Sequence, residues 1–217
     1  MNVIVVNNFE SMSEEVAKMV HGQITRKPDS VLGLATGSSP LGVYKLLAEY
    51  HAKGTDFSKI TTFNLDEYVG LAPDHPQSYR YYMNENLFSK INVNPEKTFI
   101  PSGIAEDLEA ECQRYEEKIK NAGGIDLQLL GIGSNAHIGF NEPGTAFGTV
   151  TQVVDLAEST IQDNARFFAS IDEVPTQAIS MGIKSIMQAK NIILMANGGS
   201  KAEAIFDAVK GPVTTKV

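Results

Sequence analysis

The 217-residue sequence predicts a single α/β domain that is doubly wound, with a mostly parallel, Rossmann-like sheet and helices on both of its faces. Short apolar runs alternate with amphipathic stretches along the whole chain, and strands that alternate with helices form parallel sheets covered on both sides. No internal repeat, low-complexity tract or linker interrupts this alternation. Residues 1–217 are therefore expected to form one domain, and this length can bury a sizeable core.

Each expected element has its own local signal. Apolar runs predict strands, in chain order, at residues 2–6, 31–35, 60–64, 97–100, 125–132, 152–155, 177–180 and 191–196. Ser11 is followed three residues later by Glu14, which is the capping-box spacing that opens a first helix. A second helix is expected after TGSSP, through residues 44–50, and others at residues 77–88, 107–121, 158–168, 185–189 and 200–209.

Charge and cysteine content exclude several classes of protein. A formal net charge of −8 argues against nucleic acids and anionic membranes as partners, because both attract basic surfaces. The N-terminus lacks a signal-peptide pattern, and no apolar run approaches the roughly 18 residues of a membrane span. The single cysteine, Cys112, lies at helical spacing from apolar residues, which predicts a core position and fits a reducing cytoplasm. The histidine spacings match no metal site, and no metal is expected.

The predicted fold determines where a site should lie. Ligands of open parallel sheets bind outside the carboxyl ends of the strands. Four polar segments directly follow predicted strands, namely TGSSP after Ala35, the acidic pair after Leu65, GIGSNAHIGFNEPG at residues 131–144, and NGGSK after Ala196. We expect these four segments to meet at one edge of the sheet.

The segment TGSSP contains Gly37, Ser38 and Ser39 between a strand and a helix. Exposed amides at a helix N-terminus bind anions, so the segment is either a phosphate site or a plain tight turn. Asp66 and Glu67 end a strand that is otherwise apolar. A carboxylate at such a position is either a partly desolvated base with a raised pKa or the cap of the following turn.

The glycine-rich turn is the most specific of the four segments. Its glycines allow sharp turns and close approach to a ligand. His137 is suited to proton transfer near neutral pH, and Glu142 to orienting and charging its imidazole. The alternative is a polar turn whose histidine satisfies buried carbonyls. Arg166 and Lys201 are either surface charges or, together with TGSSP, the local positive field that a phosphate needs in a net-acidic protein.

In this order, the motifs LGLATGSSPLGVYK, TFNLDEYVGL, HPQSYRYYM, QRYEEKI, HIGFNEPG, NARFF, GSKAEAI and KGPVT resemble those of the glucosamine-6-phosphate deaminase family over nearly the whole chain. The pair FNLDEY and HIGFNEPG separates that family from the lactonases acting on 6-phosphogluconate, which lack FNEP. The resemblance implies conversion of glucosamine 6-phosphate and water to fructose 6-phosphate and ammonia. It implies no cofactor.

The resemblance also implies roles for individual residues. Asp66 corresponds to the base that removes the C2 proton, and His137 to the residue that assists ring opening with Asn135 and Glu142. The implied substrate-binding residues are Gly37, Ser38, Ser39, Tyr79, Arg166 and Lys201. Residues around 155–177 would form a mobile lid.

Two departures from the family pattern affect the ring-opening turn. Asn135 stands where many members have aspartate, and Ala136 stands where glycine is more usual. Asn135 can orient His137 but cannot stabilise its charged form, which leaves that task to Glu142. In longer members of the family, a segment shortly after the FNEP motif binds the phosphate of an allosteric activator. The corresponding residues here, 144–155, include no lysine or arginine. We therefore expect a monomer or small homo-oligomer without an allosteric activator.

Two other functions remain open from the sequence. One is a lactonase or isomerase acting on another sugar phosphate. The other is a non-catalytic sugar-phosphate sensor. For a sensor we would expect a fused DNA-binding helix-turn-helix and a basic face, and this sequence shows neither.

Overall fold

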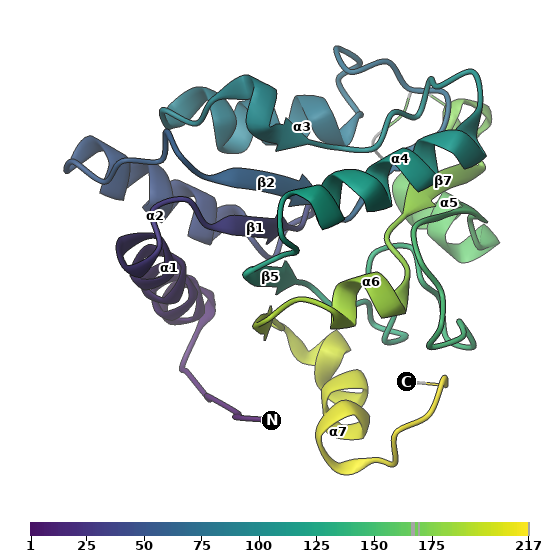
Figure 1. Cartoon of the computed structure of the whole chain (residues 1–217). Coiled ribbons are helices and arrows are strands. Elements are labelled where there is room, and N and C mark those ends of the chain that lie inside the picture. The colour runs from purple at the N-terminus through teal and green to yellow at the C-terminus, as the bar shows by residue number, and fades with distance from the viewer. Residues whose placement is uncertain (166–167, 169, 217) are drawn as a thin grey trace.

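The computed structural model describes residues 1–165, 168 and 170–216. A five-stranded parallel sheet forms its centre, in the order β4–β2–β1–β5–β8 (Figure 1). The strands are β1 (Val31–Leu34), β2 (Thr61–Asn64), β4 (Thr98–Phe99), β5 (Leu127–Leu130) and β8 (Ile192–Leu194). The chain adds strands outward from β1 in both directions, so the predicted doubly wound α/β fold is confirmed.

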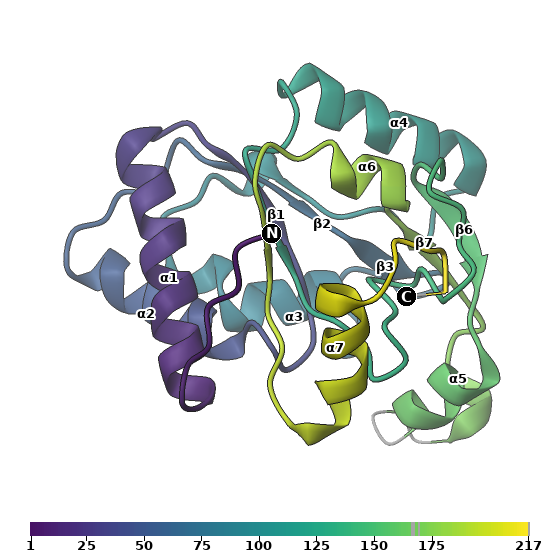
Figure 2. The same cartoon turned by 90° about the horizontal axis from the view of Figure 1, so that it is seen from below.

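Helices cover both faces of this sheet. They are α1 (Phe9–Arg26), α2 (Leu41–Ala52), α3 (Tyr79–Asn86), α4 (Leu108–Asn121), α5 (Glu158–Ala165), α6 (Ile183–Met187) and α7 (Ala202–Lys210), with short 3-10 turns at Phe88–Lys90, Pro95–Lys97, Ile171–Glu173 and Gly199–Lys201. Figure 2 shows α1, α2 and α3 on one side of the sheet and α4 and α6 on the other. Each side has its own apolar cluster, around Tyr44 on the first and Tyr115 on the second.

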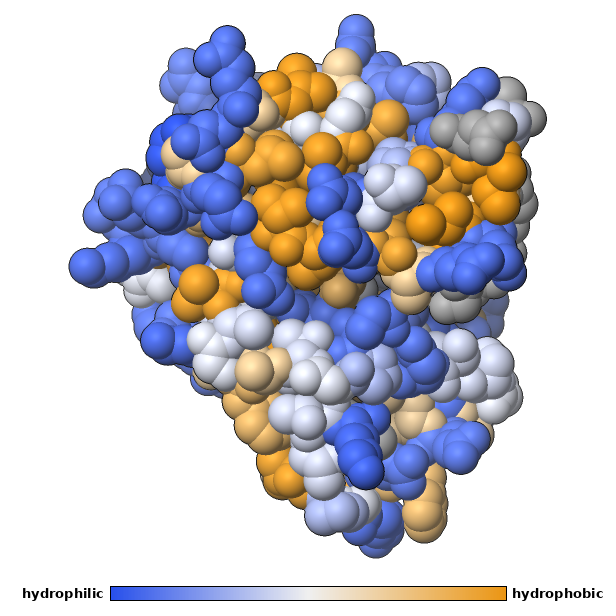
Figure 3. All heavy atoms as spheres, turned by 90° about the vertical axis from the view of Figure 1, so that its right-hand side faces the viewer, coloured by the Kyte–Doolittle hydropathy of each residue, from blue (hydrophilic) through white to orange (hydrophobic). Residues whose placement is uncertain are grey.

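A second, three-stranded sheet was not predicted. Strands β3 (Asp66–Tyr68), β7 (Gln177–Ser180) and β6 (Gln152–Asp155) pair antiparallel in the order β3–β7–β6. The chain passes from β2 into β3 through Leu65 alone, so the acidic pair extends a strand into this sheet instead of ending one. The sheet lies on the side of the molecule shown in Figure 3, where apolar side chains gather over the upper part of the face.

The predicted first strand, residues 2–6, is wrong. This segment is exposed and pairs with no strand in the described part of the chain, with Val5 89% exposed. An apolar run is a local signal, whereas a strand needs a partner to satisfy its backbone groups. The first helix also begins earlier than expected, because Asn8 and not Ser11 is its N-cap: Asn8 Oδ1 accepts the Ser11 amide at 2.8 Å.

Asp126 ties the amino ends of the central strands together. Its carboxylate accepts the Val31 amide at 2.8 Å and forms ion pairs with Lys27 at 2.6 Å and Lys190 at 2.7 Å. Burial acts to raise the pKa of Asp126, but these partners outweigh it and lower the pKa to about 2. Asp126 therefore anchors the end of the sheet opposite to the expected site. Within the described residues, no helix has the length and apolar character needed to cross a membrane.

Candidate active site

The segment TGSSP turns between β1 and α2 at the carboxyl edge of the sheet. Gly37 has φ +81°, a left-handed conformation that favours glycine. The Tyr82 hydroxyl donates to the Gly37 carbonyl at 2.6 Å, which fixes the turn against α3. Ser39 lies close to the end of β5, since a Cβ built on Gly131 would be 3.5 Å from Ser39 Oγ. The helix N-terminus after Pro40 has no side-chain cap, so its amides are suited to an anion.

Asp66 begins β3 and is only 5% exposed. Burial, followed by the negative charge of Glu67, raises the pKa of the Asp66 carboxyl to about 8. Its Oδ2 lies beside the glycine-rich turn: a Cβ on Gly139 would be 3.1 Å from this oxygen and 3.1 Å from Ser180 Oγ. Of the two alternatives from the sequence, the burial and the raised pKa of Asp66 favour the desolvated carboxylate over the cap of a turn.

The glycine-rich turn brings His137 back against its own start. The Gly133 amide donates to the His137 carbonyl at 2.8 Å, and a Cβ on Gly133 would be only 2.3 Å from His137 Nδ1. Only glycine therefore fits beneath the imidazole. Ala136 has φ 72°, which is the left-handed region that a residue with a side chain adopts at a cost of roughly 1–2 kcal/mol. Ala136, at a position where glycine is more usual, therefore strains the turn.

Asn135 connects His137 to Glu142. Asn135 Oδ1 lies 2.7 Å from His137 Nδ1, and Asn135 Nδ2 donates to Glu142 Oε2 at 2.7 Å. Because the amide oxygen can only accept, Nδ1 carries the proton and Nε2 is the basic nitrogen of the ring. Glu142 was expected to orient the imidazole, and the Asn135 amide lies between the two groups and bridges them. Thr160 of α5 donates to the other oxygen, Glu142 Oε1, at 3.1 Å.

Tyr79 forms an aromatic wall with two other rings. Its ring centroid lies 5.0 Å from that of Tyr68 and 6.1 Å from that of Phe140, with which it is nearly parallel. Burial raises the pKa of Tyr79 well above the usual value, and its hydroxyl interacts with the Thr36 side chain of the TGSSP strand end. Tyr79 thus joins three of the four predicted segments.

Lys201 reaches the same edge from the start of α7. Its ammonium donates to the Ile132 carbonyl, near the start of the glycine-rich turn, and burial lowers its pKa. Arg166, the second predicted cation, lies outside the described residues. Apart from Arg166, the predicted site residues fall on segments that meet at the carboxyl edge of the sheet.

This arrangement can move protons. A buried carboxyl of raised pKa and an imidazole held in one tautomer lie on touching segments, beside a cation and a helix N-terminus. Among the described residues, no group of three histidine, cysteine or acidic side chains could hold a metal ion. A hollow of about 360 Å³ lies elsewhere, beside Arg80 and Thr98, and none of the predicted site residues lines it.

Ser180 and Thr160 are site residues that the sequence reasoning missed. Ser180 pairs with Asp66 across the strands, and its hydroxyl accepts the Phe140 amide at 3.2 Å. It ends a predicted strand, so the rule that found the other segments would also have found Ser180. Nothing in the sequence signals Thr160, whose contact with Glu142 depends on how α5 folds back.

Comparisons with known proteins agree with this geometry. A family model described as glucosamine-6-phosphate isomerases/6-phosphogluconolactonase matches residues 7–216. A glucosamine-6-phosphate deaminase of Thermoanaerobacter sp. (strain X514) is 59% identical, over 100% of this chain and 86% of the relative. The deaminase of Lachnoclostridium phytofermentans is 58% identical, over 100% of this chain and 92% of the relative.

Solved structures give the same answer for the fold. A monomeric glucosamine-6-phosphate deaminase superposes with a TM-score of 0.97 at 49% identity, covering 100% of this chain and 90% of that one. A 6-phosphogluconolactonase of Thermotoga maritima superposes with a TM-score of 0.75 at 18% identity, covering 97% and 89% of the two chains. The second likeness bears on the fold alone.

Proposed function

This chain belongs to the family of glucosamine-6-phosphate isomerases and 6-phosphogluconolactonases, and within it we propose that the protein is a glucosamine-6-phosphate deaminase. It converts glucosamine 6-phosphate and water to fructose 6-phosphate and ammonia. The observation that carries this proposal is the buried Asp66 carboxyl beside the turn that holds His137. Deaminases at 54–59% identity over the whole chain support the same substrate.

Ring opening is the first task. A pyranose hides its carbonyl as a hemiacetal, so one proton must leave O1 while another reaches the ring oxygen. His137 can do both in turn, because Nε2 is its basic nitrogen and Asn135 accepts from Nδ1. Glu142 supports the charged imidazole through Asn135, which has no charge of its own.

Proton transfer between carbons is the second task. Next to the opened carbonyl, the C2 proton is acidic, and Asp66 in its ionised form removes it. A proton of the C2 ammonium group passes to O1 as the enolamine forms. The same carboxyl then delivers the C2 proton to C1, which turns the enolamine into a protonated 2-imine. Water adds at C2 and ammonia leaves, which gives the keto sugar. Burial makes Asp66 a stronger base than an exposed aspartate, because its raised pKa increases its affinity for the proton.

Phosphate binding is assigned to Gly37, Ser38 and Ser39, to Lys201, and to Arg166. The uncapped start of α2 and the position of Lys201 at the same sheet edge support the first two assignments. Tyr79 lines the sugar site. Residues 155–177 act as the lid, which the contact between Thr160 and Glu142 supports. The enzyme works in the cytoplasm as a monomer or small homo-oligomer without an activator.

Ammonia release from glucosamine 6-phosphate, measured with purified protein, tests this function. The matched arms are hydrolysis of 6-phosphogluconolactone and equilibrium binding of glucosamine 6-phosphate. We expect ammonia and no lactone hydrolysis. Lactone hydrolysis without ammonia would make the protein a lactonase, and binding without any turnover would make it a sensor.

A further inference from the structure

Glu67 follows Asp66 directly and is buried as deeply, at 3% exposure. Successive side chains of a strand point to opposite faces, so the two carboxylates of β3 leave the strand in opposite directions. Asp66 lies beside Gly139 and Ser180, whereas Glu67 meets the start of α3. A buried carboxylate is costly unless it is paired or well hydrogen-bonded, so its presence here needs an explanation.

The Glu67 carboxylate binds three backbone amides. Oε1 accepts from Tyr68 at 3.0 Å and from Tyr79 at 2.8 Å, and Oε2 accepts from Arg80 at 3.0 Å. Tyr79 and Arg80 are the first two residues of α3, whose N-cap is Ser78. Glu67 therefore holds the first turn of the helix that carries Tyr79 against β3, the strand that carries Asp66. Acidic groups at a helix N-terminus are stabilised by the orphan amides and the helix dipole.

The Arg80 side chain forms no ion pair with Glu67, and its charge acts on Glu67 only from a distance. Its guanidinium donates to Thr98 Oγ1 and to the Thr98 carbonyl, both at 2.8 Å, and its Cζ lies 5.8 Å from the centre of the Phe88 ring. Within the described residues, no ion pair joins Arg80 to Glu67. The negative charge of Glu67 is thus held by neutral amides and acts on its surroundings.

The groups that act on Asp66 can be named. Glu67 is its acidic neighbour on β3, and Tyr68, Tyr79 and Tyr115 are the phenols that interact with it from β3, α3 and α4. Burial raises the pKa of each of these three phenols, which keeps them neutral at ordinary pH. Burial also raises the pKa of Glu67, while its three amide donors and the charge of Arg80 oppose that shift.

We propose that Glu67 is a positioning residue of the deamination site, which fixes Tyr79 through the start of α3 and, by its charge, strengthens Asp66 as a base. The proposal rests on the proposed function. It divides the two carboxylates of the acidic pair into one that exchanges a proton with the sugar and one that never touches it. A nearby like charge raises the proton affinity of a carboxyl, and of two such groups the one with better hydrogen bonds stays ionised.

Two variants separate the effect of the Glu67 charge from the effect of its side-chain length. Glu67→Gln keeps the length of the side chain and one acceptor, but it removes the charge and presents an NH2 group to the Arg80 amide. Glu67→Asp keeps the charge, but its side chain is too short to accept from the amides of both β3 and α3. The matched control is Glu111→Gln, because Glu111 of α4 is another buried glutamate that accepts a backbone amide, that of Ser102 at 3.0 Å.

The measurement is the pH dependence of kcat/KM. In Glu67→Gln we expect the acid limb to move down by about 0.5–1 pH unit and KM to rise several-fold, since a lost neighbouring charge lowers the proton affinity of Asp66. In Glu67→Asp we expect the acid limb to remain at the same pH and KM to rise. Glu111→Gln should leave both unchanged. An unmoved limb in a folded Glu67→Gln protein, or equal shifts in both Glu67 variants, would overturn the proposal.

A titration without turnover keeps this test independent of the activity. Carbon-13 NMR of labelled carboxyl groups, with Asp66 assigned by its loss in Asp66→Asn, reports both carboxyls in the unmutated protein. Glu67 must be ionised over the range in which Asp66 titrates; a Glu67 that is still protonated there would refute the proposal even if Glu67→Gln does not fold. Absence of ammonia release from the unmutated protein would instead refute the proposed function and leave this titration valid.

Discussion

Replacing Asp66 with asparagine should abolish turnover and make the protein more stable at neutral pH. Asparagine has the shape of a neutral carboxyl and can keep the contacts around Gly139 and Ser180, but it cannot take a proton from C2. Loss of a general base lowers turnover by about 10²–10⁴-fold. Substrate binding should remain largely intact, because none of the proposed phosphate contacts changes.

The gain in stability follows from the raised pKa of Asp66, about 8 in the folded protein. An unfolded aspartate has a pKa of about 3.9. Between these values the folded state binds one more proton than the unfolded state, so stability falls as pH rises through this window. Each pH unit in this window lowers the free energy of unfolding by about 1.4 kcal/mol. The total loss is about 1.5 kcal/mol at pH 5 and at most about 4 kcal/mol at pH 7. Relaxation of the site reduces the latter figure to about 2–4 kcal/mol.

Urea unfolding of both proteins at pH 5 and pH 7, followed by circular dichroism, measures this difference. The free energy of unfolding of Asp66→Asn should exceed that of the unmutated protein by more at pH 7 than at pH 5. Asp74→Asn removes an exposed carboxylate and serves as the control. A stability difference that does not change with pH would refute the account of Asp66 as a desolvated acid. Retained turnover would show that another group removes the proton.

Four further predictions concern other parts of the molecule. His137→Gln should harm turnover of the cyclic sugar more than exchange of the C1 proton of fructose 6-phosphate, and equal losses would give His137 a broader role. Lys201→Ala and Arg166→Ala should each raise KM about 10- to 100-fold and weaken discrimination against free glucosamine; a change confined to kcat would contradict the phosphate contacts. N-acetylglucosamine 6-phosphate should not activate the enzyme, because residues 144–155 contain no lysine or arginine; a sigmoidal substrate curve that becomes hyperbolic on its addition would show otherwise. The pKa of Asp126 lies below its unfolded value, so this carboxylate contributes stability above about pH 4 that is lost as pH falls toward 2. Asp126→Asn should lower the free energy of unfolding by about 1–2 kcal/mol at pH 7, allowing for its exposed lysine partners. Thermal unfolding measures this change, and an unchanged melting temperature would contradict the role of Asp126 as an anchor.

The sequence predicted the parallel sheet well because its strands lie in short segments rich in apolar and β-branched residues, a local signal that needs no knowledge of their partners. The predicted bounds of β6 and β7 match those found. The antiparallel sheet in which β7 pairs with both β6 and β3 was missed, since the three residues of β3 after Leu65 are too few for a periodic signal. The failure at residues 2–6 has the opposite cause: the apolar signal is present, but no partner strand is.

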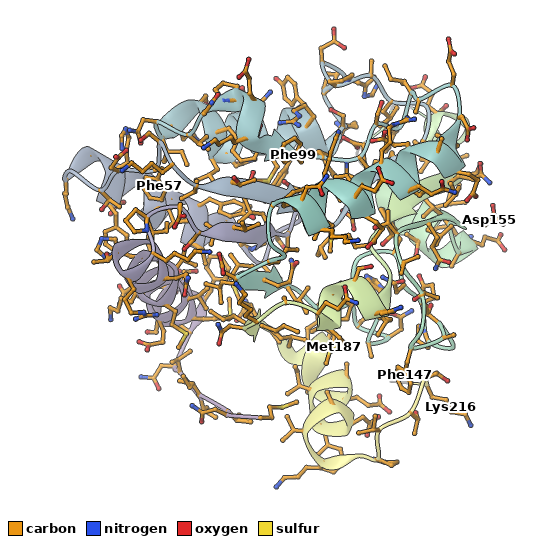
Figure 4. The ribbon with its side chains drawn as sticks, in the orientation of Figure 1. Phe57, Phe99, Phe147, Asp155, Met187 and Lys216 are labelled. Atoms are coloured by element: carbon orange, nitrogen blue, oxygen red, sulfur yellow. The ribbon has the colours of Figure 1, made fainter. Side chains whose placement is uncertain are left out.

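The same distinction holds for the site. The rule that ligands lie beyond the strand ends located the segments of Asp66, His137 and Lys201 without any coordinates. It could not show that Asn135 stands between His137 and Glu142, because Asn135 and Glu142 lie seven positions apart in an irregular turn. It also could not show that the Gly144 amide donates to the Thr215 carbonyl, which brings the chain end with Lys216 to the segment that contains Phe147 (Figure 4). This brings a cation near residues 144–155 that the local sequence does not contain.

The pairing of Asp155 with Gln177 makes the intervening segment replaceable. These residues end β6 and begin β7, lie opposite each other in the register, and are joined by a hydrogen bond of 2.8 Å between Gln177 Nε2 and Asp155 Oδ1. The chain therefore leaves and re-enters the sheet at almost one point. The entropic cost of closing a loop rises only slowly with its length. A segment of another length can therefore replace this one between the same two residues during evolution. Substrate range can then diverge by exchange of this insert while Asp66, two strands away, keeps its place.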